Sequence, residues 1–196
     1  MQRFFAALCV MATLAFPSMA ATSQWNIDPA RSTAQFVVTH LELSDVQGTF
    51  TGITGSATID DDNLSNSRVT ATIDVSTLDT GIGMRDDDLK SSNFFDVAKY
   101  PAMTFQSTKI EKTGDATAKM TGNLTLHGLT KEVTFDVNFV APAANQAGAR
   151  RNVQATTTIS RKLFGMSADE LAIGDNVSIT LDIELVKAVA PTPSAH

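Results

Sequence analysis

The chain has 196 residues, of which 43% are hydrophobic and 18% charged, and this balance suits one ordinary globular domain. Its formal net charge of −6 argues against nucleic acid as a partner and against electrostatic attachment to an anionic membrane surface. The single cysteine, Cys9, lies in the first apolar run, so we expect a domain that is held together without disulfides.

The first twenty residues have the pattern of a secretory signal peptide. One positive charge in Met1–Arg3 precedes an apolar run at 4–16, and Ser18–Ala20 offers small residues at the positions that signal peptidase reads. The apolar run is shorter than the ~20 residues that a membrane span needs. We therefore expect residues 1–20 to be removed, which leaves no integral membrane span and makes the net charge one unit more negative.

Most of the remaining chain alternates apolar and polar residues with period two, which is typical of half-buried β-strands. After a short extended lead at 23–27, the alternating segments are 32–41, 46–50, 53–59, 69–75, 102–110, 116–126, 133–139, 153–159 and 177–185. About eight substantial strands with almost no helix predict an all-β, antiparallel barrel, with a flattened sandwich as the alternative. We favour the barrel because Gly48, Gly52, Gly55 and Gly122 thin the inward face, where a filled core would need bulk.

One segment, Leu78–Phe105, interrupts the alternation. Met84–Lys90 is expected to form a short helix with Asp86–Asp88 in its first turn and a lysine in its last, as the helix dipole favours. The adjacent Phe94 and Phe95 cannot both point to the inner side of a strand. We interpret the segment as a lid in which at least one of these rings plugs the mouth of the barrel.

The sequence offers little for catalysis or metal binding. His40, His127 and His196 lack the spacing of metal ligands, and Asp60–Asn63 lacks the glycine and glutamate of a calcium loop, so a solvated turn is expected there. No nucleophile elbow, P-loop or dinucleotide fingerprint is present. We therefore expect no metal, no cofactor and no enzymatic activity. The end of the chain, 188–196, is rich in Ala and Pro and is expected to be disordered, so the domain spans 21–187.

Several segments together resemble the YceI-like family. They are 25–29, 33–41, 46–50, 84–91, 94–101 and 122–131, and the resemblance extends in order from Trp25 to Lys187. It implies a lipocalin-like, extended barrel whose long apolar cavity binds polyisoprenoid or similar amphiphilic lipids, including quinones. It also implies export to the bacterial periplasm. A homodimer is left open.

From the inward faces and the family motifs we expect one set of side chains to bind the ligand. They are Phe36, Val38, His40, Phe50, Ile73, Arg85, Phe94, Phe95, Phe105, Met120, Leu124, Phe135 and Val137. Each buried methylene of a lipid tail contributes roughly 0.8 kcal/mol, so the tail should set the affinity. Arg85 and His40 are the candidates for the rim, where Arg85 could hold a diphosphate head bidentately. Two alternatives remain: an enzyme acting on a prenyl lipid, and a filled barrel that binds a periplasmic protein.

Overall fold

The computed structural model describes residues 22–41, 43–141 and 148–189, so the predicted signal peptide and most of the predicted tail lie outside the described residues. Ten strands make up one sheet: β1 Thr22–Ile27, β2 Thr33–His40, β3 Ser44–Phe50, β4 Thr54–Asp60, β5 Arg68–Asp74, β6 Ala102–Lys112, β7 Thr117–Leu126, β8 Leu129–Val140, β9 Arg150–Ser160 and β10 Ile173–Lys187. The helical elements are α1 Gly83–Lys90 and the short 3₁₀ turns η1 Leu64–Asn66, η2 Val75–Thr77 and η4 Lys162–Phe164.

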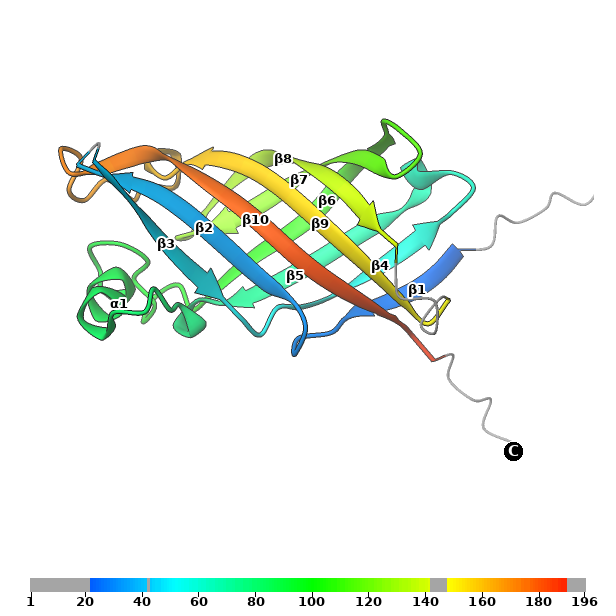
Figure 1. Cartoon of the computed structure of the whole chain (residues 1–196), viewed down its shortest axis with the longest axis horizontal. Coiled ribbons are helices and arrows are strands. Elements are labelled where there is room, and N and C mark those ends of the chain that lie inside the picture. The colour runs from blue at the N-terminus through cyan, green and yellow to red at the C-terminus, as the bar shows by residue number, and fades with distance from the viewer. Residues whose placement is uncertain (1–21, 42, 142–147, 190–196) are drawn as a thin grey trace, which may run out of the picture.

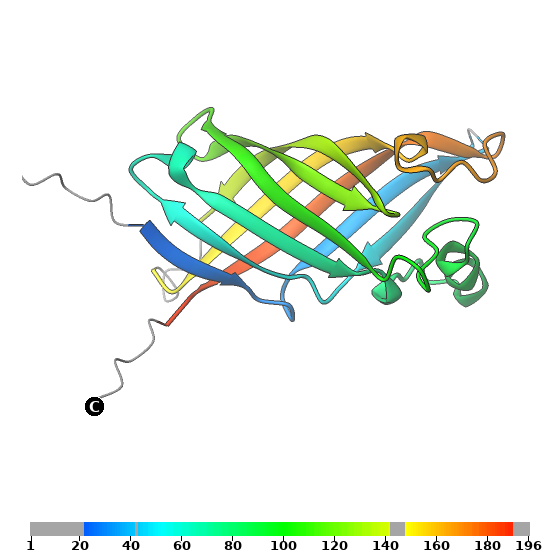
Figure 2. The same ribbon diagram turned by 180° about the vertical axis from the view of Figure 1, so that it is seen from behind.

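All neighbouring strands pair antiparallel, in the order β1-β4-β5-β6-β7-β8-β9-β10, and β10 pairs back with β1. This closes an eight-stranded barrel, which Figures 1 and 2 show from opposite sides. The first half of β10 pairs with β2, and the end of β10 pairs with β1. On their other edges, β2 pairs with β3 and β1 pairs with β4. The predicted antiparallel barrel is therefore confirmed, and the strand count rises to ten because two of its strands are each broken in two.

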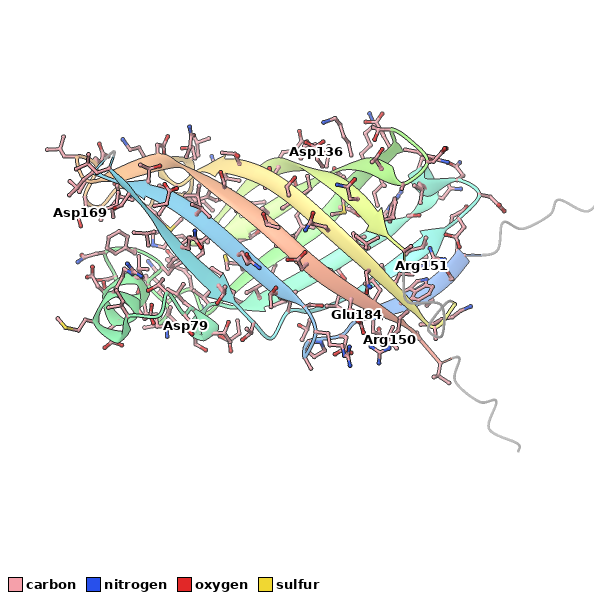
Figure 3. All side chains as sticks on the ribbon, viewed as in Figure 1. Asp79, Asp136, Arg150, Arg151, Asp169 and Glu184 are labelled. Atoms are coloured by element: carbon pink, nitrogen blue, oxygen red, sulfur yellow. The ribbon has the colours of Figure 1, made fainter. Side chains whose placement is uncertain are left out.

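Each break has a local cause. Between β1 and β2 the chain turns at Asp28–Pro29, and β10 spans the break: the backbone NH of Asp28 donates to the Glu184 carbonyl at 2.8 Å, and the NH of Glu184 donates to the Ser32 hydroxyl at 3.1 Å. Arg150 pairs with both Asp28 and Glu184, at the end of the barrel away from α1 (Figure 3). Between β3 and β4, Gly52 has a φ of +66°, and at the start of β4 Gly55 has a φ of +150°, where an added Cβ would lie 2.1 Å from the Thr70 carbonyl oxygen. Only glycine fits at position 55.

The glycines on the inner wall correct one expectation. An added Cβ at Gly48 would lie 2.4 Å from the Phe36 ring, and at Gly122 it would lie 2.5 Å from the Phe105 ring. These two glycines therefore do not leave empty space. They let an aromatic ring from the neighbouring strand lie flat across the wall, which keeps the ring out of the middle of the barrel.

The β4–β5 connection lies at the end of the barrel away from α1 (Figure 1). The Asp60 side chain is only 1% exposed and accepts hydrogen bonds from the backbone NH groups of Asp62 and Asn63 and from the Asn66 amide, at 2.9–3.1 Å. The Asn66 amide and the Asn63 NH lower the pKa of Asp60. The expected solvated turn is wrong for this residue, which instead organises the turn, whereas Asp61 and Asp62 are exposed as expected.

The lid lies at the other end of the barrel (Figure 1). Helix α1 begins one residue earlier than predicted, and only Asp86 of the three aspartates lies in its first turn. Among the described strands, β3 pairs only with β2. On the other edge of β3, Asp79 of the lid forms an isolated β-bridge with Thr49 through two backbone hydrogen bonds of 2.8 and 3.0 Å. No helix in the described ranges is both long enough and apolar enough to cross a bilayer.

Candidate functional site: an apolar cavity with a polar mouth

The interior of the barrel is a long cavity of about 400 Å³. All ten strands contribute to its wall, which extends from Ile59 and Leu64 at the end away from α1 to Leu89 of α1 and Ile173 at the other. On β10 alone the lining residues extend from Ile173 to Leu185, which corresponds to roughly 40 Å along a strand, or ~30 Å along the axis at the usual tilt of a barrel. A volume this small over such a length admits a single chain rather than a broad ring system.

The exposure of the wall shows that the interior is unfilled. Ile179, Leu181 and Ile183 alternate along β10 and line the cavity, yet all three are only partly buried. Phe36, Phe105 and many other inward apolar side chains share this pattern. In a filled barrel these residues would be covered by one another, because protein cores pack to the density of organic crystals. Their residual exposure is to the cavity.

All thirteen residues expected to bind a ligand line this cavity: Phe36, Val38, His40, Phe50, Ile73, Arg85, Phe94, Phe95, Phe105, Met120, Leu124, Phe135 and Val137. The structure therefore brings them together around one space, and their contact with a ligand stays a prediction. Sequence reasoning did not select the lining residues of the last two strands, although the same alternation marks Val153, Ile159, Val177, Ile179, Leu181, Ile183 and Leu185.

Aromatic contacts join the lid to the barrel wall. Phe95 meets Phe50 edge-on, with ring centroids 5.6 Å apart and planes at 78°, and Phe50 in turn lies 5.7 Å from Phe36. Phe94 is buried and also lines the cavity. Both rings of the lid pair therefore face the cavity, and Phe95 extends the aromatic wall from β2 and β3 into the lid.

The charged and titratable side chains of the lining lie at the lid end. They are His40, Arg85, Asp88, Arg161 and Asp169. Asp169 is labelled at this end in Figure 3, and the other four come from the end of β2, from α1 and from the end of β9. The cavity is thus an apolar tube with its ionisable groups at one opening, which is the polarity of a single-chain amphiphile.

Arg85 is held in place by the lid itself. Its Nε donates to the Thr80 hydroxyl and its Nη2 to the Thr80 carbonyl, both at 2.8 Å. The Thr80 hydroxyl donates to Asp86 at 2.5 Å, and this hydrogen bond lowers the pKa of the Asp86 carboxyl. Nη1 of Arg85 takes no part in these bonds, so one edge of the guanidinium is left for a further acceptor.

Arg161, like Asp88 and Asp169, is a mouth residue that sequence reasoning did not select. It is 4% exposed, and its guanidinium donates at 2.7–2.9 Å to four backbone carbonyls, those of Met166, Ala168, Ile173 and Gly174. No Asp or Glu side chain among the described residues lies within 4.0 Å of it as a salt-bridge partner. The arginine therefore fixes the β9–β10 loop from inside. Every residue has a backbone carbonyl, so the sequence does not identify these acceptors and no residue pattern predicts this role.

The described part of the chain contains no group of three or more His, Cys, Asp or Glu side chains arranged to hold a metal ion. His40 and His127 are separated within this end: His40 lines the cavity, whereas His127 Nδ1 lies 3.1 Å from the Phe164 carbonyl and its ring packs on Tyr100 at 4.8 Å. The chemistry that the site offers is apolar enclosure with charged groups at the opening.

Comparison with known proteins agrees with this architecture. The chain is 32% identical over 190 residues to a UPF0312 protein of Pseudomonas aeruginosa, a match that covers 95% of this chain and 99% of that protein. Among solved structures, BcnA of Burkholderia cenocepacia superposes with a TM-score of 0.73 at 25% identity, covering 81% of this chain and 98% of BcnA. A polyisoprenoid binding domain from Saccharophagus degradans has the same fold, with a TM-score of 0.65 at 17% identity, over 84% of this chain and 98% of that domain. Residues 25–185 match the model of the YceI-like domain, and the chain therefore belongs to the YceI-like family.

Proposed function

We propose that the chain binds one molecule of an isoprenoid-type amphiphilic lipid, with a polyprenyl chain or the tail of a quinone in the barrel and the head group at the lid end. The observation that carries this proposal is the distribution of polarity along one continuous cavity of about 400 Å³. Its wall is almost entirely apolar, with Gln35, Ser67 and Thr104 as the uncharged polar residues, and its ionisable groups are confined to one end. The volume lies within the ~300–1,000 Å³ of typical small-molecule sites.

The energetics favour a ligand that is mostly tail. Ten methylene groups taken from water into the cavity contribute roughly 8 kcal/mol before the costs of binding. A neutral hydrogen bond at the mouth adds only ~1 kcal/mol net. Affinity therefore depends on the fit of the tail, while Arg85, with its free edge, and His40 select the head group. An anionic head would gain more from Arg85 than a neutral one, because charge-assisted hydrogen bonds are about twice as strong.

The direct test is the identity of what the protein carries. Purified protein is extracted with organic solvent, the extract is analysed by mass spectrometry, and the emptied protein is then titrated with farnesol and geranylgeraniol. We expect a prenyl or quinone-type lipid at up to one molecule per chain and saturable uptake by the emptied protein. No amphiphile in the extract together with no uptake would refute the proposal, and turnover of an added prenyl diphosphate would indicate the enzymatic alternative.

We propose further that the protein works in the periplasm after removal of residues 1–20. The support is the charged start, apolar run and small residues of that segment. Expression of the full chain in a bacterium, followed by fractionation and N-terminal sequencing, tests this. The expected product is periplasmic and begins at Ala21, and a cytoplasmic product that retains Met1 would contradict it.

A further inference from the structure

Apolar side chains are exposed around the mouth of the cavity. Nine large apolar side chains are exposed in the described residues. Six of them belong to the β2–β3 hairpin, the start of α1 and the β9–β10 loop, all at this end. We call these six the apolar rim: Leu41, Leu43, Ile82, Met84, Leu163 and Leu171. Leu43, Met84 and Leu171 are 88%, 87% and 101% exposed, so they contribute almost nothing to the core. Isolated exposed leucines are ordinary on protein surfaces, but such a concentration at one opening marks an interaction site.

The rim belongs to elements that form one surface. Leu41 and Leu43 lie on the β2–β3 hairpin, and Leu163 and Leu171 lie on the β9–β10 loop. A backbone hydrogen bond from the Leu41 NH to the Ala172 carbonyl, at 2.6 Å, joins the hairpin to the β9–β10 loop. Figure 1 shows the hairpin and the loop on one side of this end and α1 on the other, so the rim flanks the opening on both sides.

The β9–β10 loop is held in position while its leucines are exposed. Arg161 binds the loop carbonyls from inside, and the backbone NH groups of Ala172 and Ile173 both donate to the Asp169 carbonyl at 2.9 Å. Leu171, between these anchored positions, is the most exposed apolar side chain of the rim. The hydrogen bonds hold this loop rigid with a fully exposed leucine, and such a leucine is suited to contact an apolar phase.

The opposite end of the barrel has a different surface. The β4–β5 connection exposes Asp61, Asp62 and Asn63, and the β6–β7 turn exposes Thr113 and Asp115. Both connections are therefore polar, and the large apolar side chains exposed near this end are Val140 at the end of β8 and Val189 beyond β10. The concentration of six such side chains at the rim matches the asymmetry of the cavity, whose ionisable lining residues lie at the rim end.

We propose that the apolar rim inserts into the surface of a zwitterionic phospholipid bilayer and aligns the mouth of the cavity with the membrane interface. The proposal rests on the proposed function, because a lipid that resides in a bilayer must leave it to reach the cavity. Exposed acidic side chains stand beside the rim: Asp87 and Asp88 follow Met84, and Asp169 precedes Leu171, while Glu170 is paired with Lys162 at 3.3 Å. These carboxylates would repel an anionic surface and would also repel each other across a dimer formed through the rim. A zwitterionic bilayer presents ammonium groups to them and accepts the leucines below its head groups.

The test uses the full mature protein and vesicles of phosphatidylethanolamine and phosphatidylcholine in a flotation assay. The variant Leu43→Ser/Met84→Ser/Leu171→Ser removes the three most exposed side chains of the rim, and its melting temperature is measured to confirm folding. Val140→Ser/Val189→Ser is the matched control, because these side chains are exposed but lie outside the rim. Binding of farnesol from solution and extraction of a fluorescent prenyl lipid from the vesicles are measured in parallel.

We expect the rim variant to lose at least about tenfold in vesicle binding and in the rate of extraction, because three apolar insertions are removed. The control variant and the wild type should bind vesicles equally, and all three should bind farnesol equally. Vesicle binding that is equal in the rim variant and the wild type would overturn the proposal. So would a wild-type dimer that does not float with vesicles and that the rim variant dissociates, or stronger binding to vesicles rich in phosphatidylglycerol. Loss of vesicle binding in the rim variant with no farnesol binding in any form would support the docking surface and refute the lipid-filled cavity.

Discussion

Replacement of Leu124 by tryptophan tests whether the barrel holds a ligand chain. Leu124 lies on β7, lines the cavity and is only partly buried. A larger side chain there enters existing space, so the free energy of unfolding should change by less than about 1 kcal/mol, below the ~1–3 kcal/mol that overpacking a filled core costs. Phe135 is a less suitable position, because it is 4% exposed and packs edge-on against Phe105 with ring centroids 5.4 Å apart.

The effect on binding should be much larger than the effect on stability. If the indole displaces about three methylene groups of the tail, binding loses roughly 2 kcal/mol. This corresponds to a Kd about 30 times higher. A long chain that must pass the indole loses more contacts than a short one. We therefore expect the affinity for geranylgeraniol to fall more than the affinity for farnesol.

The assay is a titration of the emptied protein with both alcohols, alongside urea denaturation of the same samples. Asn123→Trp is the matched control, because Asn123 is the preceding residue on β7 and its side chain is exposed on the outer face. Unchanged affinity for the longer alcohol in Leu124→Trp, or losses of binding and stability of equal size, would show that Leu124 is a core residue and would refute the open cavity.

Three further predictions concern the parts that shape the cavity. Arg161→Met removes four hydrogen bonds to carbonyls and should lower the free energy of unfolding by about 3–5 kcal/mol, measured by urea denaturation. A loss below ~1 kcal/mol would mean that the β9–β10 loop does not depend on it. In Gly48→Ala the new Cβ would lie 2.4 Å from the Phe36 ring, so the ring should move toward the cavity and prenyl alcohol binding should weaken. Unchanged affinity would show that the Phe36 ring does not move into the space that the ligand occupies. Asp60 has a lowered pKa because of Asn66 and Asn63, so its carboxylate stabilises the fold above the unfolded pKa of about 4, and this contribution is lost as the pH falls through the folded value. Urea midpoints should therefore drop in this acidic range, and Asp60→Asn should make the drop smaller.

The strands and their inward faces could be predicted from the sequence because the signal is local. A period of two follows directly from the alternation of side chains along a strand, so the alternation of Ile179, Leu181 and Ile183 already identifies a wall. The lid helix was also predictable, since the alternation stops there. The thirteen predicted binding residues surround one cavity because closing the sheet gathers every inward face.

The features that could not be predicted depend on partners far away in the chain. Glu184 of β10 spans the break between β1 and β2, although 152 positions separate it from Ser32. Arg161 binds only main-chain carbonyls, which every residue carries. Asp60 looked like part of an exposed acidic run, and its burial depends on the side chains of Asn66 and Ser67 that follow on η1 and after it. Pairing partners and side-chain environments of this kind are fixed by the closed barrel rather than by the local pattern.

The two ends of the barrel together define the direction in which a lipid can enter. At the end away from α1, Leu64 and Ser67 of the β4–β5 connection line the cavity, and Asp60 holds this connection through three hydrogen bonds that a tail entering there would have to disrupt. At the lid end the outer edge of β3 is covered by the bridge between Thr49 and Asp79 and by the contact of Phe95 with Phe50. Separating two aromatic rings and a short backbone ladder costs far less than burying an unpaired charge. Entry at the lid end, tail first, leaves the head group beside Arg85 without requiring the barrel to open.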